Sequence, residues 1–234
     1  MRLRLRQFRP RTGPHEHRVV QPAQPLRHTS LRAPEPIGLL LGDHDGLNRL
    51  AGLFSFAACS RHTIVHIPLR DGVPPDEGTG EPVDLVLAHH TLGLRPGKWP
   101  ELRRRLGPGT SLTVRTDEAR TARDAAAWRE RLHRADFRDE LRHATHARTF
   151  FLIGSRGVFA ETAMQFAEAA GWGPRMKGVV EGRSALMTAL PALVQEPGGG
   201  HPYEVLVCFK PYPPYGHFRR PGRRDSGNGA PLTG

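Results

Sequence analysis

The sequence predicts an α/β domain built on a mainly parallel sheet of about seven strands, with helices on both faces and an antiparallel hairpin at the C-terminal end. Short apolar runs, typical of strands buried on both faces, alternate along the chain with longer segments whose apolar residues recur at helical spacing. Such alternation favours a parallel sheet covered by helices. The last two predicted strands have no helical segment between them, which indicates a hairpin.

Seven strands are expected where apolar or β-branched residues form short runs. They cover residues 37–42, 63–68, 83–88, 111–115, 149–153, 176–180 and 204–209. Helices are expected after the first, third, fourth and fifth strands, because apolar residues recur there every three or four positions. Pro100 and Gly171 are typical of a helix start and a helix end, respectively.

Charge and proline content divide the chain into three parts. Residues 1–36 hold six prolines and eight arginines against two acids, so we expect a mostly disordered basic arm. Residues 211–234 have the same character and are expected to form a disordered basic tail. The segment between them, 37–210, is nearly neutral although the whole chain has a formal net charge of +11, and it is the expected domain.

Several classes of protein are disfavoured by composition. No apolar run approaches the roughly 20 residues of a membrane helix, and the first 36 residues contain no apolar core of a signal peptide. Cys59 and Cys208 cannot form a disulfide framework or a cysteine zinc site. We therefore expect a soluble, cytoplasmic protein without a membrane partner; the oligomeric state is left open.

The two basic ends predict a possible nucleic-acid partner, because cationic arms are attracted to polyanions without a shaped groove. A bias in genome composition is the alternative explanation. The chain has 31 arginines and only three lysines, a ratio that a GC-rich genome produces without selection for binding.

The first candidate site is the turn Gly42–Gly46, which joins the first strand to a helix. Its glycines allow a tight turn, and a helix N-terminus offers free amides to a polar ligand. Asp43 and Asp45 favour hydroxyl or ammonium groups over phosphate. The alternative is an ordinary strand–helix turn capped by Asp45.

The second candidate site follows the third strand, where His89 and His90 are adjacent. One of them could face a ligand bound beyond the carboxyl ends of the strands and act as a general base or hydrogen-bond donor. The alternative is that both side chains are packed in the protein or solvated. Asp84 begins the same strand. No metal site is predicted, because the histidines and acids between 133 and 146 lack the spacing of a known metal motif.

Residues 83–116 resemble the middle of a class I S-adenosylmethionine-dependent methyltransferase. Asp84-Leu85-Val86 matches a central strand of that family, Leu106–Thr110 its proline–glycine turn, and Leu112–Val114 the next strand. The resemblance implies a Rossmann-like fold and S-adenosylmethionine as cofactor, with His89 or His90 as base. The residues that it implies for cofactor binding are Gly42, Asp43, Asp45, Gly46 and Asp84.

Two functions are therefore predicted. The first is an S-adenosylmethionine-dependent methyltransferase, possibly acting on nucleic acid. The second is a non-catalytic methyltransferase-like module that contacts nucleic acid or a protein partner through its basic arms. The second is favoured by the absence of the family's Gly-x-Gly-x-Gly loop after the first strand, and the first by the retained strand–turn pattern.

Overall fold

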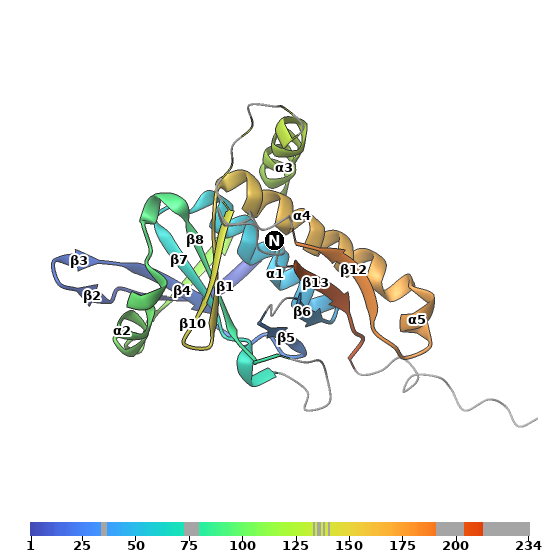
Figure 1. The fold of residues 1–234 in the computed structure, drawn as a ribbon, viewed down its shortest axis with the longest axis horizontal. Helices are drawn as coiled ribbons and strands as arrows, with labels where there is room; N and C mark the ends of the chain where they lie inside the picture. Colours follow the sequence, from blue (N-terminus) through green and yellow to red (C-terminus); the bar gives the residue numbers. More distant parts are fainter. Residues whose placement is uncertain are drawn as a thin grey trace, which may run out of the picture.

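The computed structural model describes residues 1–33, 37–72, 80–132, 134, 137, 139, 141–190 and 204–212. Within them the chain forms a seven-stranded sheet, a four-stranded sheet and a two-stranded hairpin, with helices between and beside the two larger sheets (Figure 1). The α/β class that the sequence predicts is confirmed.

The seven-stranded sheet is mixed rather than mainly parallel. Its order is β10 (Leu141–His146), β11 (Thr149–Gly154), β8 (Asp84–His89), β7 (Thr63–Ile67), β4 (Arg18–Pro22), β1 (Arg2–Phe8) and β9 (Thr110–Arg115). Only the pairs β11–β8 and β4–β7 are parallel. The difference arises because two strands from the N-terminal segment, β1 and β4, are inserted between β7 and β9.

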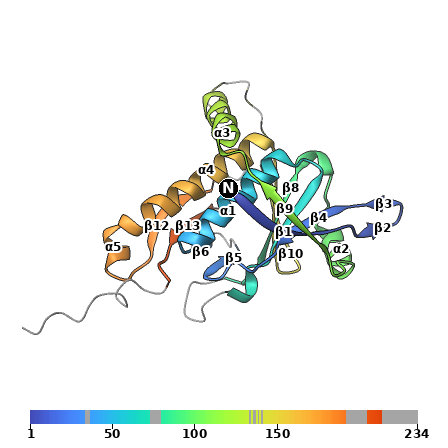
Figure 2. The ribbon, with the colours of Figure 1, turned by 180° about the vertical axis from the view of Figure 1, so that it is seen from behind.

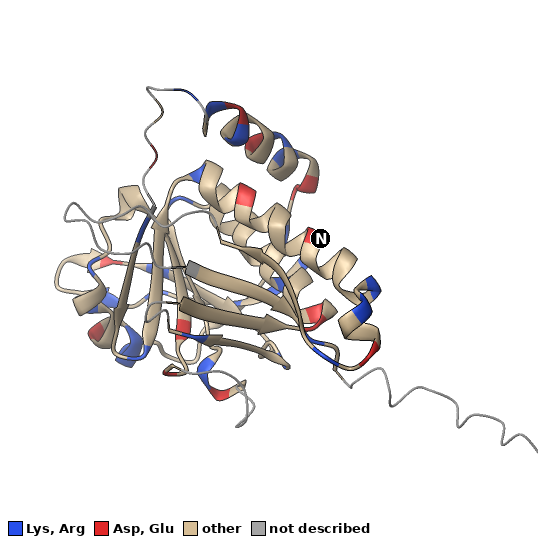
Figure 3. Ribbon diagram, turned by 45° about the vertical axis from the view of Figure 1, so that its right-hand side comes forward, with Lys and Arg blue, Asp and Glu red and all other residues tan. Residues whose placement is uncertain are grey.

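The prediction that residues 1–36 form a disordered arm is wrong for the described residues 1–33. Leu3 and Leu5 alternate with exposed arginines along β1 and are buried, which is the period-two pattern of a half-buried strand. The segment continues through β2 (Arg11–Thr12), β3 (His15–Glu16), β4 and β5 (Thr29–Arg32). Six of its eight arginines therefore lie on strands, and Arg9 and Arg27 lie between them. Figure 3 shows Lys and Arg along the strands and helices of the folded part.

The four-stranded sheet has the order β12 (Ala185–Ala189), β13 (Glu204–Phe209), β6 (Ile37–Gly42) and β5. The first and last predicted strands, β6 and β13, pair in parallel here, in a different sheet from β8. An antiparallel C-terminal hairpin is present, but its first strand is β12. The strand predicted over 176–180 is wrong: a 3-10 turn, η4 (Gly173–Arg175), leads into the short helix α5 (Lys177–Val180).

Three long helices and one short one occur where helical spacing predicts them. They are α1 (His44–Cys59), α2 (Trp99–Arg104), α3 (Glu118–Leu132) and α4 (Arg156–Trp172), with 3-10 turns η1 (Arg70–Gly72), η2 (His90–Leu92) and η3 (Pro96–Lys98). Helix α1 packs against α4 and contacts strands of both large sheets. None of the helices in the described ranges is long and apolar enough to span a bilayer.

Two apolar clusters lie against the seven-stranded sheet. In the larger one, Phe54 of α1 packs against Phe159 and Phe166 of α4, and Leu5 and Leu87 belong to the same cluster. In the smaller one, Trp99 and Leu102 of α2 cluster with sheet residues such as Phe8, Val19 and Val86. These residues alternate along their strands with those of the larger cluster, so they lie on the other face of the sheet. The predicted C-terminal tail, beyond Pro211 and Tyr212, lies outside the described residues.

Candidate anion-binding site

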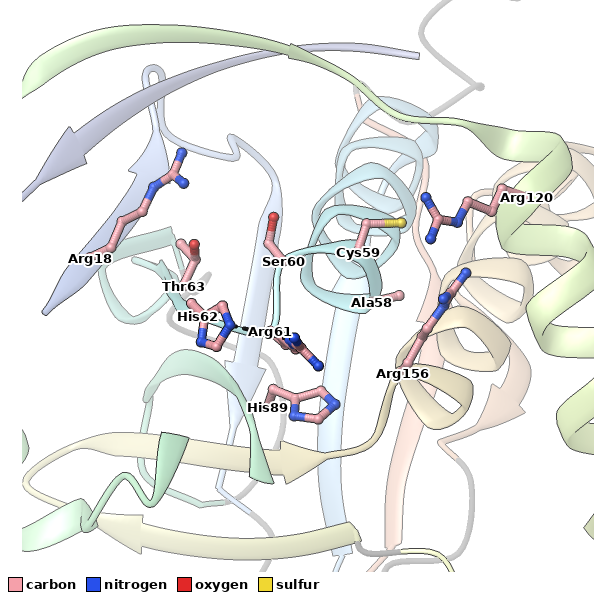
Figure 4. A pocket seen from close by; sticks show the side chains of 10 residues that line it. All are labelled: Arg18, Ala58, Cys59, Ser60, Arg61, His62, Thr63, His89, Arg120 and Arg156. Atoms are coloured by element: carbon pink, nitrogen blue, oxygen red, sulfur yellow. Dashed lines mark hydrogen bonds between the residues drawn. The ribbon is translucent and has the colours of Figure 1, made fainter. Parts of the chain in front are cut away.

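A cationic pocket lies beside the end of β8, where the C-terminus of α1, the N-terminus of α4 and the start of α3 come together (Figure 4). Its volume is about 560 Å³. Basic and hydroxyl side chains dominate the lining, with no aspartate or glutamate among its members. They are Arg18, Ala58, Cys59, Ser60, Arg61, His62, Thr63, His89, Arg120 and Arg156.

The positive charge of this pocket is only partly neutralised. Arg18 donates to the side-chain oxygen of Gln7 at 3.0 Å, and Arg61 donates to the ring of His62 at 3.2 Å, so neither faces a carboxylate. The guanidinium of Arg120 has no acidic partner within the part of the chain that the structure describes. Three of the four arginines thus keep their full charge available to a ligand.

The turn after α1 places two of the lining side chains. The helix ends at Cys59, and the amide of its C-cap, Ser60, bonds the carbonyl of Ala57. The amide of Thr63 then donates to the carbonyl of Ser60 at 3.0 Å, which closes a tight turn into β7. Arg61 and His62 sit at the tip of this turn and are exposed. The turn therefore presents a guanidinium and an imidazole at the mouth of the pocket.

Arg156 enters the pocket from the first turn of α4. Ser155 caps this helix by accepting from the amide of Val158 at 3.3 Å. A cation at a helix N-terminus is opposed by the helix dipole. Asp124 on α3 offsets this opposition, because its carboxylate accepts from Nε and Nη2 of Arg156, the former at 2.7 Å. The ion pair fixes the position of Arg156 while α3 also supplies Arg120.

His89 is the one predicted catalytic residue that lines the pocket. Its Nδ1 accepts from the amide of Thr91 at 3.3 Å, so in the neutral ring the proton is on Nε2. Burial is the main cause that lowers the pKa of His89, and the charges of His90 and Arg61 act in the same direction. The imidazole is therefore a neutral donor near pH 7. His90 stacks at 4.4 Å between ring centroids but does not line the pocket.

The turn Gly42–Gly46 lies at the opposite end of α1. The helix has 16 residues, so its two ends are about 24 Å apart. Asp43, not Asp45, is its N-cap: the carboxylate accepts from the amide of Gly46 at 2.8 Å, and burial raises the pKa of Asp43. The structure does not bring this predicted cofactor turn together with His89 or His90.

Gly46 and Asp45 have local roles in that turn. A Cβ on Gly46 would lie 1.9 Å from the hydroxyl oxygen of Thr29 on β5, so packing of β5 against the helix requires glycine. Asp45 is exposed and its carboxylate lies 3.8 Å from the guanidinium of Arg49, one helical turn later. These contacts are intrachain, and the Asp45 side chain stays exposed.

Asp84 is the centre of a buried polar cluster at the other end of β8 from His89. Its carboxylate accepts from the backbone amides of Leu69 and Arg70 at 3.1 and 3.3 Å and pairs with the Arg70 guanidinium at 2.9 Å. His66 approaches it at 3.4 Å. Burial alone would raise the pKa of Asp84, but these partners together hold it below its usual value. The carboxylate ties β8 to the segment that follows β7.

Sequence reasoning missed Arg18, Arg61, Arg120 and Arg156. Their only local signal is position: Arg61 lies two residues before the strand predicted over 63–68, and Arg156 lies three residues after the strand predicted over 149–153. They come from four segments that are far apart in the chain, so the fold alone brings them to one pocket.

Within the described residues, no three metal-ligating side chains are grouped closely enough to hold an ion; His133, Asp136 and Glu140 lie outside them. Comparison with known protein families, curated proteins and solved structures finds no match to this chain.

Proposed function

We propose that this protein is a binding module for an anion that carries two or more phosphoryl groups, and that the ligand occupies the cationic pocket. The observation that supports this proposal is that four arginines from four segments of the chain line one cavity, and that no carboxylate among the described residues lines it. The planar, multiply donating guanidinium fork is suited to phosphate oxygens.

A multiply charged ligand is favoured over a single phosphate. Three of the lining arginines have no acidic partner among the described residues, so a ligand with several negative charges would balance them. The volume of about 560 Å³ falls within the usual range of roughly 300–1,000 Å³ for small-molecule sites. Nε2 of His89 and the Ser60 hydroxyl add neutral donors for further oxygens.

Recognition of the phosphates, rather than of an attached nucleoside, is also favoured by the lining. It contains no carboxylate or carboxamide to bond ribose hydroxyls or a base edge, and no Phe, Tyr or Trp on which a base could stack. We therefore expect inorganic tripolyphosphate to bind about as tightly as a nucleoside triphosphate.

The methyltransferase function stays a prediction. Asp43 or Asp45, with Asp84, is predicted to hold S-adenosylmethionine. The carboxylates of Asp43 and Asp84 accept hydrogen bonds from their own chain, whereas Asp45 is exposed. Calorimetric titration with S-adenosylmethionine tests that function separately, because none of the residues predicted to bind this cofactor lines the cationic pocket.

Calorimetric titration with inorganic tripolyphosphate tests the proposal. Each of Arg61→Gln and Arg120→Gln removes one charge-assisted contact and should weaken binding about tenfold. Arg123→Gln is the matched control, since Arg123 is an exposed arginine on the same helix as Arg120 and does not line the pocket. Equal losses in the control and the pocket variants, or no binding by the folded unmodified protein, would contradict the proposal.

A further inference from the structure

Strands β1 and β9 lie next to each other at one edge of the seven-stranded sheet (Figure 2). One face of this pair carries a second cationic surface. Paired residues on the two strands present basic and hydroxyl side chains in register. The pairs are Arg2 with Arg115, Arg4 with Thr113, and Arg6 with Ser111. All six residues are exposed, and we call this surface the arginine face.

The arginine face is on the opposite side of the sheet from the cationic pocket. Along β1, Leu3 and Leu5 alternate with the three arginines and are buried in the cluster that contains α1. Helix α1 also contributes Ala58 and Cys59 to the pocket. A ligand on the arginine face therefore does not reach the pocket by lying flat on the sheet.

The charges of the arginine face are not balanced by the protein. None of its four arginines has a carboxylate within 4.0 Å in the described ranges of the chain. Like charges placed directly opposite each other on paired strands, such as Arg2 and Arg115, lower the stability of a sheet. An external polyanion would relieve this repulsion.

We infer that the arginine face binds the sugar–phosphate backbone of a nucleic-acid duplex without reading its sequence. Arginine guanidinium groups and serine or threonine hydroxyls are the side chains that bond backbone phosphates most often. Arginines on one face of β1 repeat every second residue, about 6.8 Å apart, so three can follow one strand of the backbone.

The composition of this face favours a duplex backbone over two other polyanions. It has no aromatic side chain on which the bases of a single strand could stack, and stacking supplies much of single-strand affinity. It also exposes no apolar side chain to enter an anionic membrane. What remains is a flat, hydrophilic surface suited to phosphates that are already ordered by a duplex.

The measurement is fluorescence anisotropy of a labelled DNA duplex with the full chain at several salt concentrations. For four contacted phosphates, the logarithm of the association constant should fall with the logarithm of salt concentration with a slope of about −3.6. The triple variant Arg2→Gln, Arg4→Gln, Arg6→Gln should flatten this slope by about 3, since each lost phosphate contact removes about one. Circular dichroism checks that the triple variant is folded.

The control variant is Arg123→Gln, Arg131→Gln, Arg175→Gln, which removes the same charge from exposed positions on α3 and η4. It should keep most of the slope. Equal slopes for the two triple variants would overturn the inference, as would tighter binding of the single strand or of phosphatidylserine vesicles than of the duplex. The outcome is separate from the tripolyphosphate titration, because the two experiments change different residues.

Discussion

At the scale of single residues, His89 links the cationic pocket to pH. Its pKa is lowered by burial first, then by the charges of His90, Arg61 and His62, while Asp139 acts in the opposite direction. A bound anion would oppose the positive charge around His89 and raise this pKa. Proton binding and anion binding therefore favour each other, since linkage between two sites is reciprocal.

We predict that sulfate binds more tightly as the pH falls below about 6.5, the ordinary histidine pKa, because the pKa of His89 in the free protein lies below that value and a bound anion raises it. Sulfate is chosen because its own charge is constant over this range. His89→Asn should remove part of the increase, because asparagine keeps a neutral N–H donor but cannot take up a proton. Titration calorimetry at several pH values measures both. A pH dependence identical in the variant would show that His89 does not face the anion.

Two other residues show what a sequence pattern leaves undecided. Asp43 follows a strand, the position where ligands bind in open α/β sheets, and Asp84 begins the strand that resembles a central strand of the methyltransferase family. In the structure Asp43 caps a helix, and Asp84 is enclosed by backbone amides and basic side chains. The residue type and the local position are the same for a binding and a structural carboxylate; only the donors from distant segments distinguish them.

At the scale of elements, the hairpin turn between β10 and β11 is strained. Ala147 and Arg148 both have positive φ, at 49° and 55°. This left-handed conformation matches the twist of a two-residue hairpin but disfavours residues with a Cβ. The asparagine–glycine pair that predicts such a turn is absent, which is one reason that the sequence gives no sign of β10.

We predict that Ala147→Gly raises the free energy of unfolding by about 0.5–1 kcal/mol, because glycine adopts positive φ without a steric cost and the gain exceeds its entropic penalty. The same substitution at Ala144, within β10, should lower stability, since its backbone is extended there. Urea denaturation measures both. A decrease at both positions would show that the turn is not strained in solution.

Helices and strands could be predicted from the sequence where the apolar residues of a segment followed one spacing, either helical or that of a strand. The four main helices and the apolar strands β6, β8 and β11 follow from their patterns. Strand β1 was missed because prolines throughout residues 1–36 outweighed the short alternation of leucine and arginine. The 176–180 run was mistaken for a strand because a short apolar run fits either a strand or a buried helical turn.

At the scale of the whole molecule, pairing between distant segments determines two features that could not be predicted from the sequence: the division into two sheets and the assembly of the pocket. The α/β class follows from alternating elements, but the division into two sheets depends on β6 pairing with β13 near the other end of the chain. The pocket depends on the same kind of contact, since Arg18 and Arg156 come from opposite halves of the sequence. Net charge indicated a polyanion partner and not where it would bind.

The central claim is that the pocket, and not the basic surface in general, holds a compact phosphate-bearing anion. Histidine side-chain NMR tests it most directly, because two of the 13 histidines, His62 and His89, line the pocket. We predict that tripolyphosphate shifts the imidazole resonances of these two in a saturable manner and leaves the exposed His15 and His146 unchanged. Equal shifts at all four, or no shift at His62 and His89, would contradict the account.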